Sequence, residues 1–394
     1  MISVTEARQI IREHTSPLPP VQWPLSKAAG LVLAEDVFAA LDMPSFRQSS
    51  MDGYALSFRD WKEHGRLKIA GVIAAGNKDD IPLAPGTAVR IFTGAAVPSG
   101  ADTVVMQEKV RVENGELLID DLSLEREANV RPIGVEIRSG DLALGKGSFL
   151  NPAAIGFLTG LGTREVFVYP KPVVSIVVTG NELQDAGSPL EYGQVYESNS
   201  YGLKAALQEW HINEVTVFRV ADTLDELTAV LAQALEQSDV VLLTGGISVG
   251  DFDFVLQATI NNGVHQHFHR IKQRPAKPLF FGKWENKYVF GLPGNPASGL
   301  TAFYEYALPA LGIMSRRNYT LQTLNVPLSK AFKKPAGLTH FLKGHYDGHT
   351  ATPLNAQESF RLSSFAHSNC LIQINEEVTD CPEGSLVEVH LLPG

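Results

Sequence analysis

Three short loops combine glycine with polar residues, a fourth turn carries Asp222, and each of the four follows an apolar stretch of the chain. They are TGNEL at 179–183, Asp222, GGISVGDFDF at 245–254 and LPGNPASG at 292–299. Glycine lets the backbone approach a ligand closely, and the free N–H groups at a helix start favour an anion such as phosphate. A single loop of this kind is most often only a turn. Four of them at one edge of a sheet favour a phosphate-binding site.

Three carboxylates, Glu182, Asp222 and Asp253, belong to the same loops. Carboxylate oxygens are hard ligands, and beside phosphate groups they suit Mg²⁺, which bridges carboxylate and phosphate oxygens. The alternative for Asp222 and Asp253 is that they cap the helices that follow them. The residues therefore predict either a magnesium site or two helix caps.

A basic segment, IKQRPAKPLFFG at 271–282, places Lys272, Arg274 and Lys277 around two prolines. Proline restricts the backbone and so holds neighbouring cations in place. Because the chain has a formal net charge of −10, a group of cations here indicates a local anion site. The alternative is a solvated basic loop.

Three histidines, His265, His267 and His269, occupy alternate positions and would share one face of a strand. Three imidazoles can bind zinc. The surrounding residues offer little support for a metal and no carboxylate for an open site, so we expect an exposed strand face there. The Asp-Gly step in SSMDGYA at 49–55 is by itself typical of a turn.

Hydrophobic spacing divides the chain into three parts. Residues 3–14 have helical spacing, and from 43 to 150 short apolar stretches alternate with turn residues, as in antiparallel β structure. From 172 onward strands alternate with helices, which predicts an α/β domain with a largely parallel sheet, and 319–394 return to short strands. Predicted helices lie at 152–162, 199–210, 223–237, 252–262 and 297–312, and predicted strands of the α/β part at 172–180, 214–220, 239–246, 264–271 and 287–292. Ligands of such sheets bind beyond the carboxyl ends of the strands, where the four loops fall.

Composition excludes several classes of protein. Of 394 residues, 44% are hydrophobic and 19% charged, which is too apolar for a disordered chain and long enough for about two to four domains. The 43 acidic against 33 basic residues argue against a nucleic-acid binder. Cys370 and Cys381 are too few for a disulfide framework or a Cys-rich zinc site. No apolar run reaches the roughly 18 residues that span a membrane, and the N-terminus does not resemble a signal peptide, so we expect a cytoplasmic protein.

Six motifs follow one another along the chain. They are SSMDGYAL (49–56), RIFTGAAVPSGADTVVMQE (90–108), TGNEL (179–183), ESNS (197–200), GGISVGDFDF (245–254) and LPGNPASG (292–299). In this order and at these spacings they resemble the motifs of the molybdopterin molybdenumtransferases, the MoeA family, which is related to the C-terminal part of gephyrin. The resemblance covers essentially the whole chain.

The resemblance implies an organisation and a reaction. It implies an elongated domain I (1–20 with 131–166), a β-rich domain II (21–130), a doubly wound α/β molybdopterin-binding domain III (167–314) and a C-terminal β-barrel, domain IV (315–394). It implies a homodimer whose cleft combines domains III and IV of one subunit with domain II of the other. The implied reaction inserts molybdate into adenylylated molybdopterin, requires Mg²⁺ and releases AMP. A molybdopterin adenylyltransferase is a candidate partner, and neither nucleic acid nor membrane is expected.

The matched motifs also carry over residue roles as expectations. Asp52 and Thr93, with Glu108 in the same strand context, resemble catalytic residues that reach the partner's cleft. Glu182, Asp222 and Asp253 resemble the acidic cluster that handles Mg²⁺ and the nucleotide. The pterin and its phosphates would contact Gly245, Gly246, Ser248, Gly250, Gly294 and Asn295, and the molybdate pocket would include Arg274, Lys277, Ser298, Lys343 and Ser359.

Four positions depart from the family's usual residues. Asn181 replaces a frequent Asp, and Glu136 lies in a Gly-Val-Glu run where Gly-Glu-Asp is usual. Arg274 replaces the first lysine of a Lys-Pro-Gly-Lys-Pro run, and Lys343 stands where Arg is usual. Exchanging Arg and Lys keeps the charge but changes the hydrogen-bond geometry. Asn181 and Glu136 leave room for an altered rate or metal preference.

Two other functions stay open at this point. The first is a molybdopterin adenylyltransferase, or a related nucleotide-processing enzyme, on the same α/β domain. The long N-terminal region and the β-rich tail argue against that function. The second is a non-catalytic dimeric scaffold like the receptor-anchoring role of gephyrin, and no long linker or partner-binding appendage supports it.

Overall fold

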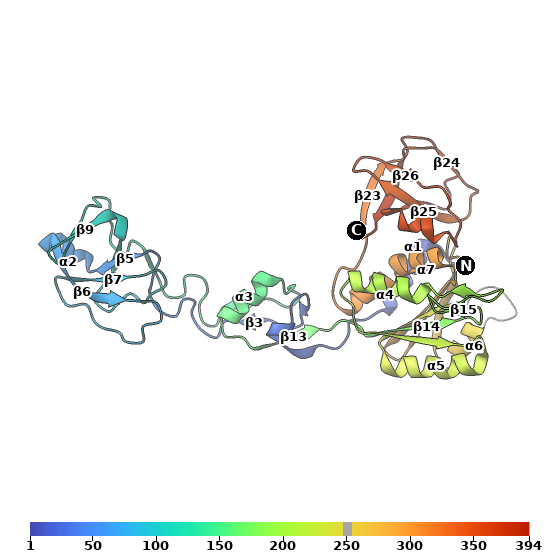
Figure 1. Ribbon diagram of the computed structural model, residues 1–394, viewed down its shortest axis with the longest axis horizontal. Helices are drawn as coiled ribbons and strands as arrows, with labels where there is room; N and C mark the ends of the chain where they lie inside the picture. The colour runs from blue at the N-terminus through green and yellow to red at the C-terminus, as the bar shows by residue number, and fades with distance from the viewer. Residues whose placement is uncertain (247–253, 394) are drawn as a thin grey trace. The chain divides into compact units, whose positions relative to one another are not determined.

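The computed structural model describes residues 1–246 and 254–393 (Figure 1). The chain forms two compact units: the first comprises Met1–Val21 and Tyr169–Gly394, and the second comprises Gln22–Val168. Each unit has a buried apolar core of its own. Among the described residues, no helix combines the length and the apolar character needed to cross a membrane.

A six-stranded sheet in the order β17-β14-β18-β22-β21-β19 forms the centre of the first unit. The first four strands run parallel, and β21 and β19 complete the sheet in antiparallel fashion. The strands are β14 (Val174–Thr179), β17 (Val215–Val220), β18 (Val240–Thr244), β19 (His265–Arg270), β21 (Pro278–Trp284) and β22 (Lys287–Leu292).

Helices cover both faces of this sheet because its central strands are apolar on both sides. In β14, Ile176 shares a core with Leu203 of α4, whereas the adjacent Val177 shares another core with Leu227 of α5. Helices α5 and α6 lie on one face, and α4 and α7 lie on the other (Figure 1). The bounds are α4 (Asn199–Glu209), α5 (Leu224–Gln237), α6 (Phe254–Asn261) and α7 (Pro296–Ala302). A short parallel pair, β15 (Leu183–Gln184) and β16 (Val195–Tyr196), lies between β14 and α4 in the chain.

The N-terminal helix α1 (Val4–His14) packs into the same core as α8 (Leu308–Met314). It begins with a reciprocal cap in which Ser3 and Glu6 each accept the other's backbone N–H. Between α7 and α8 the chain makes a π-helical turn, η3 (Phe303–Ala307), whose five residues are all buried. The predicted single helix at 297–312 therefore consists of three parts, because tertiary contacts favour the wider turn at its centre.

The C-terminal part of the first unit is a β-rich region with the strand order β20-β25-β27-β29-β23 and β26 beside β25. A further pair joins β24 to β28, and one short helix, α9 (Leu362–Ala366), precedes β27. The strands are β20 (Gln273–Arg274), β23 (Gln322–Pro327), β24 (Phe332–Lys333), β25 (Thr339–Tyr346), β26 (Ala351–Pro353), β27 (Cys370–Ile374), β28 (Asp380–Cys381) and β29 (Leu386–Leu391). Since β20 belongs to the basic segment, that segment joins the α/β part to this region.

The second unit contains a six-stranded sheet, β8-β5-β7-β6-β10-β9, and three small sheets, β1-β13-β2, β11-β4 and β12-β3. Its helices are α2 (Phe58–His64) and α3 (Pro152–Gly160), with 3-10 turns η1 (Leu25–Lys27) and η2 (Gln107–Lys109). The strands are β1 (Val21–Pro24), β2 (Val32–Leu33), β3 (Val37–Phe38), β4 (Gln48–Ser49), β5 (Gly53–Leu56), β6 (Arg66–Ile73), β7 (Thr87–Ile91), β8 (Thr103–Met106), β9 (Val110–Glu113), β10 (Glu116–Ile119), β11 (Val130–Arg131), β12 (Leu142–Leu144) and β13 (Glu165–Tyr169).

The predicted fold class, an α/β domain between β-rich parts, is confirmed. Sequence patterning missed α2 and also β21, whose apolar residues followed the basic turn and were not recognised as a strand. The two units divide the chain differently from the four expected domains. Helix α1 buries its apolar face in the first unit, whereas residues 131–166 belong to the second, where β3 pairs with β12; β1 pairs with β13. The division into four domains stays a prediction.

Candidate functional site

The carboxyl ends of four parallel strands bring together the loops that the sequence singled out. Thr179 at the end of β14 pairs with Val220 at the end of β17, and Thr244 of β18 pairs with Leu292 of β22. Because the strands end in register, the chain leaves the sheet along one edge at all four positions. The expectation that these loops share one sheet edge is confirmed for the described residues.

Three glycines form a floor without side chains at this edge. A Cβ on Gly245 would lie 2.3 Å from the carbonyl oxygen of Thr179, and the φ of Gly245 is 97°. A Cβ on Gly294 would lie 3.4 Å from the Cα of Gly245, so the two glycine backbones are close neighbours. Gly246 also has a positive φ, of 57°. We call Gly245, Gly246 and Gly294 the glycine floor, because none of the three has a side chain over its peptide groups.

Asp222 borders the glycine floor and is held there by two hydrogen bonds. The hydroxyl of Thr179 donates to Asp222 Oδ1 at 3.1 Å, and the Asp222 N–H donates to Asn181 Oδ1 at 3.1 Å. A Cβ on Gly246 would lie 3.6 Å from Asp222 Oδ1. Helix α5 begins after Thr223 without a side-chain cap, so the alternative role of Asp222 as a helix cap is wrong. The departure at Asn181 is also accounted for, since its amide oxygen accepts the bond that a carboxylate would accept.

Only part of the predicted acidic cluster falls within the described residues. Glu182 is exposed and folds back over Gly180, where a Cβ would lie 2.9 Å from the Glu182 carboxylate. Asp253, together with Ser248 and Gly250, lies outside the described residues. In the part of the chain that the structure describes, no three His, Cys, Asp or Glu side chains are grouped so as to hold a metal ion. The magnesium site therefore stays a prediction.

Two asparagines tie the loops of this edge together. Asn199, in the first turn of α4, donates to the Gly294 carbonyl at 2.8 Å and to Thr244 Oγ1 at 3.0 Å. Asn295 donates to Ser359 Oγ at 2.9 Å, so the predicted residues Asn295 and Ser359 are in contact. Asn199 was not predicted as a site residue, although it lies in the ESNS motif at 197–200, and the order of the motifs would have identified it.

Lys343 has a different environment from the one its predicted role requires. It is buried, and its ammonium donates to the carbonyl oxygens of Ala356, Glu358 and Arg361 at 2.8, 3.1 and 3.0 Å. An ammonium has three protons, so no donor is left for an oxyanion. Burial lowers the pKa of Lys343 from its ordinary value. The structure thus assigns Lys343 to holding the loop that carries Ser359, and this corrects the expectation that Lys343 binds substrate.

The basic segment forms a tight turn between β20 and β21. The N–H of Ile271 donates to the Lys277 carbonyl at 3.0 Å and closes the turn. Arg274 and Lys277 are exposed, and neither side chain has a hydrogen bond or ion pair with the residues that the structure describes. Ser298 is buried within α7, only 2% exposed. The two cations are therefore available to a ligand, whereas Ser298 is enclosed by protein.

The histidines of β19 do not form the exposed strand face that was expected. His267 is half-buried and stacks between His14 of α1, with ring centroids 4.0 Å apart, and Phe281 of β21, at 5.3 Å. Burial and the neighbouring His14 and His265 lower the pKa of His267 to about 4, so its ring is neutral near pH 7. His265 is exposed and His269 is half-buried. The expectation failed because α1 covers part of this face, which periodicity in the strand alone cannot reveal.

The second unit contains a separate polar cluster at the expected positions Asp52 and Thr93. Thr93 donates its backbone N–H and its hydroxyl to Asp52 Oδ1, both at 2.8 Å. The hydrogen bonds from Thr93 lower the pKa of Asp52 below its ordinary value. Gly53 follows in β5, where a Cβ would lie 1.9 Å from the Val105 carbonyl oxygen. The pairing of β5 with β8 therefore requires a glycine at position 53, directly after Asp52.

Glu108 and Arg90 complete this cluster. The Gln107 side chain donates to Glu108 at 2.9 Å, which lowers the pKa of Glu108, and Arg90 donates to Gln107. The Arg90 guanidinium lies 5.1 Å from the ring centroid of Tyr54. Arg90 was not predicted as part of this group, although it is the first residue of the motif at 90–108. Asp52, Thr93, Glu108 and Arg90 together form a charged group near the β5–β7 pairing, in which Thr93 and Glu108 are exposed and Asp52 and Arg90 are half-buried.

Comparison with known protein families gives three consecutive matches. The MoeA N-terminal region, described as domains I and II, matches residues 2–162, and a probable molybdopterin binding domain matches residues 175–312. The MoeA C-terminal region, domain IV, matches residues 325–392.

Relatives resemble the chain over its full length. A molybdopterin molybdenumtransferase from Haemophilus influenzae is 32% identical over 411 residues, covering 100% of both chains, and one from Staphylococcus aureus is 32% identical over 401 residues, covering 99% of this chain and 95% of the other. A crystal structure of a molybdopterin biosynthesis MoeA protein from Pyrococcus horikoshii superposes with a TM-score of 0.84 at 30% identity, with full coverage of both chains. With its glycine floor and Asp52 cluster at the family's motifs, and with this similarity from end to end, the chain belongs to the MoeA family of molybdopterin molybdenumtransferases.

Proposed function

We propose that this protein inserts molybdenum into molybdopterin during the synthesis of the molybdenum cofactor. The observation that carries the proposal is the glycine floor bordered by Asp222, at the sheet edge of a chain that matches molybdopterin molybdenumtransferases throughout. Phosphate groups bind where backbone N–H groups are free of side chains, and the floor provides such backbone. The substrate in this proposal is adenylylated molybdopterin, and the nucleotide leaves as AMP.

Mg²⁺ is part of the proposed reaction. Asp222, with Glu182 and Asp253, would hold the ion beside the phosphates. The donor chemistry of Asp222 fits this role, because Thr179 occupies one carboxylate oxygen and thereby fixes the orientation of the other. When bound, Mg²⁺ would neutralise charge on the pyrophosphate. The side chains at the carboxyl end of the sheet would then orient the phosphate groups over the glycine floor.

The molybdate anion would bind at the basic turn. Arg274 and Lys277 are exposed cations without a partner among the described residues, and a tetrahedral dianion requires such donors. The Ser359 hydroxyl, held by Asn295, would add a further donor from the loop that Lys343 stabilises. This proposal keeps Arg274, Lys277 and Ser359 in contact with substrate and moves Lys343 to a supporting role.

The proposed active form is a homodimer in which Asp52 acts on the cleft of the other subunit. Support comes from apolar side chains that the second unit exposes on its small sheets. Phe38 of β3 lies opposite Leu142 of β12, and they are 57% and 54% exposed. Trp23 of β1 and Phe167 of β13 are exposed as well. Large exposed apolar groups of this kind are typical of surfaces that bind another protein, and a second copy of the chain is the proposed occupant.

Release of AMP from adenylylated molybdopterin, measured with and without molybdate, tests the proposed function. We expect AMP release that depends on both molybdate and Mg²⁺, with molybdenum appearing on the pterin. Consumption of ATP to form adenylylated molybdopterin would instead identify an adenylyltransferase. Dimerisation without any turnover of the pterin nucleotide would favour the scaffold.

A further inference from the structure

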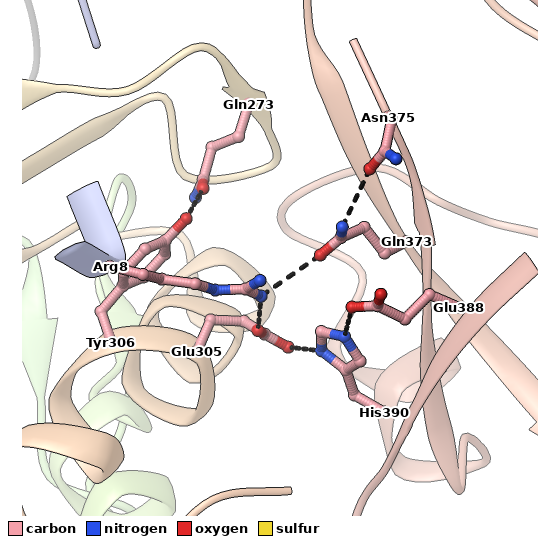
Figure 2. Close-up of polar contacts among 8 residues, drawn as sticks. All are labelled: Arg8, Gln273, Glu305, Tyr306, Gln373, Asn375, Glu388 and His390. Carbon is pink, nitrogen blue, oxygen red and sulfur yellow. Dashed lines mark hydrogen bonds and ion pairs between the residues drawn. The ribbon is translucent and has the colours of Figure 1, made fainter. Parts of the chain in front are cut away.

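A buried hydrogen-bonded pair lies beneath the basic turn that carries Arg274 and Lys277. The Tyr306 hydroxyl donates to Gln273 Oε1, and Gln273 Nε2 donates to the Ala276 carbonyl at 3.0 Å (Figure 2 shows the Tyr306–Gln273 contact). Gln273 and Tyr306 are both 0% exposed. Because water cannot replace either partner, each hydrogen bond depends on the other side chain staying in place.

The residue that this pair holds has an unusual backbone conformation. Ala276 has a φ of 59°, which is the left-handed region, and it is only 4% exposed. A residue with a Cβ adopts this conformation only when its surroundings impose it. Ala276 lies between Arg274 and Lys277, so its conformation sets the directions in which the two cations leave the turn.

The donor side of the pair is itself fixed. Tyr306 belongs to the π-helical turn η3, and its neighbour Glu305 accepts hydrogen bonds from Arg8 of α1 and from His390 of β29, the latter at 2.7 Å (Figure 2). These contacts come from three separate parts of the first unit. Tyr306 therefore has little freedom to move, and the position of its hydroxyl is defined independently of the basic turn.

We propose that Gln273 and Tyr306 are positioning residues for the anionic substrate. They would touch no substrate themselves and would act by keeping Ala276 left-handed, which directs Arg274 and Lys277 toward one oxyanion. The inference rests on the proposed function and deepens it, because it assigns the geometry of the molybdate site to a buried amide and a buried phenol.

The first test compares two glutamine variants. In Gln273→Leu we expect the KM for molybdate to rise by about tenfold, the loss expected for one misplaced charge-assisted hydrogen bond, while kcat stays within about twofold. Affinity for adenylylated molybdopterin should not change, because the glycine floor is intact. Gln373→Leu is the matched control: Gln373 belongs to the same network, accepts from Arg8 at 3.2 Å and donates to Asn375, and it makes no hydrogen bond to the turn (Figure 2).

The second test is a rescue. Glycine adopts a left-handed φ without steric cost, so adding Ala276→Gly to Gln273→Leu should return the KM for molybdate toward the wild-type value. A general loss of packing around residue 273 would not respond to this change. Tyr306→Phe, which removes only the hydroxyl, provides a milder variant if Gln273→Leu does not fold.

Hydrogen exchange of the Ile271 amide, whose N–H closes the turn, measures the order of the turn without substrate. Faster exchange is expected in Gln273→Leu and Tyr306→Phe, and wild-type exchange in Gln373→Leu. Unchanged exchange in the first two variants would overturn the positioning role whatever the activity.

Faster exchange with a wild-type KM for molybdate would overturn the link between the turn and the anion. Failure of the proposed function is recognised separately, because wild-type protein would then release no AMP in response to molybdate, and the inference would fall with it.

Discussion

Thr93 holds Asp52 through two hydrogen bonds to a single carboxylate oxygen, since its backbone N–H and its hydroxyl both lie 2.8 Å from Asp52 Oδ1. The backbone bond is the larger cause of the lowered pKa of Asp52. The other carboxylate oxygen makes no hydrogen bond with the described residues. Asp52 is therefore ionised, oriented and only half-buried, and this state is compatible with the proposed role on a ligand.

Complementation between two inactive variants tests whether Asp52 acts in the partner's cleft. We expect Asp52→Ala and Asp222→Ala each to fold and to lose most activity. A mixture at equal amounts should regain up to about a quarter of wild-type activity, because half of the dimers would be mixed and each would contain one intact site. Subunit exchange must be shown in parallel by mass measurement of tagged chains. Exchange without any recovery would place Asp52 and Asp222 in the same subunit's site or in different functions.

Replacement of Asp222 separates a metal ligand from a structural residue. In Asp222→Asn, the Mg²⁺-assisted binding of the pterin nucleotide, measured by titration calorimetry, should weaken by about tenfold to a hundredfold because an ionised ligand is lost. Asp225→Asn is the control, since Asp225 is an exposed carboxylate in the first turn of α5. Equal Mg²⁺ dependence in wild type and Asp222→Asn would contradict the metal-binding role and leave Asp222 with only its hydrogen bond from Thr179.

Lys343→Met should reduce the free energy of unfolding by about 1–3 kcal/mol, because three carbonyl oxygens would lose their buried donor. Denaturant unfolding would measure this, and Lys330→Met, at an exposed position, should change stability by less than about 0.5 kcal/mol. If Lys343→Met is as stable as wild type but has a raised KM for molybdate, Lys343 binds the substrate and does not stabilise the loop.

The buried imidazole of His390 predicts a dependence of stability on pH. Burial alone would lower the pKa of His390, but hydrogen bonds and ion pairs with Glu305 and Glu388 raise it above the ordinary 6.5 (Figure 2). The folded state thus binds this proton more tightly than the unfolded chain. The stabilisation is fully present below about pH 6.5 and is lost as the pH rises through the folded-state pKa.

His390→Gln should therefore lose part of the decline in melting temperature that wild type shows above neutral pH. The same scan on His345→Gln, at an exposed position, serves as the control and should follow wild type. Parallel pH profiles for wild type and His390→Gln would show that His390 is not protonated in the folded protein at neutral pH.

The sequence by itself determined the order of most elements and proposed the candidate site residues. The β-branched run at 172–180, ending in a glycine, favours a strand buried on both faces, so local pattern predicted the α/β part and its parallel sheet. The glycines at 245, 246 and 294 lie at the ends of predicted strands, so the sequence alone placed them at the carboxyl end of the sheet. Asp52 and Thr93 came from motif order, since their spacing of 41 residues gives no local sign of a contact.

Tertiary structure alone decided how side chains far apart in the chain are used. Lys343 has the positive charge expected of an anion-binding residue. Its ammonium nevertheless donates to three carbonyl oxygens in the loop 356–361. The sequence of β25 does not predict that this loop packs against it. His267 occupies an alternating strand position, but it is half-buried because His14 of α1 stacks on its ring. Gln273 and Tyr306 meet across 33 residues. Local sequence pattern determines the secondary structure of a segment. The hydrogen-bond partners of a buried polar side chain depend instead on which distant segment packs over it and excludes water.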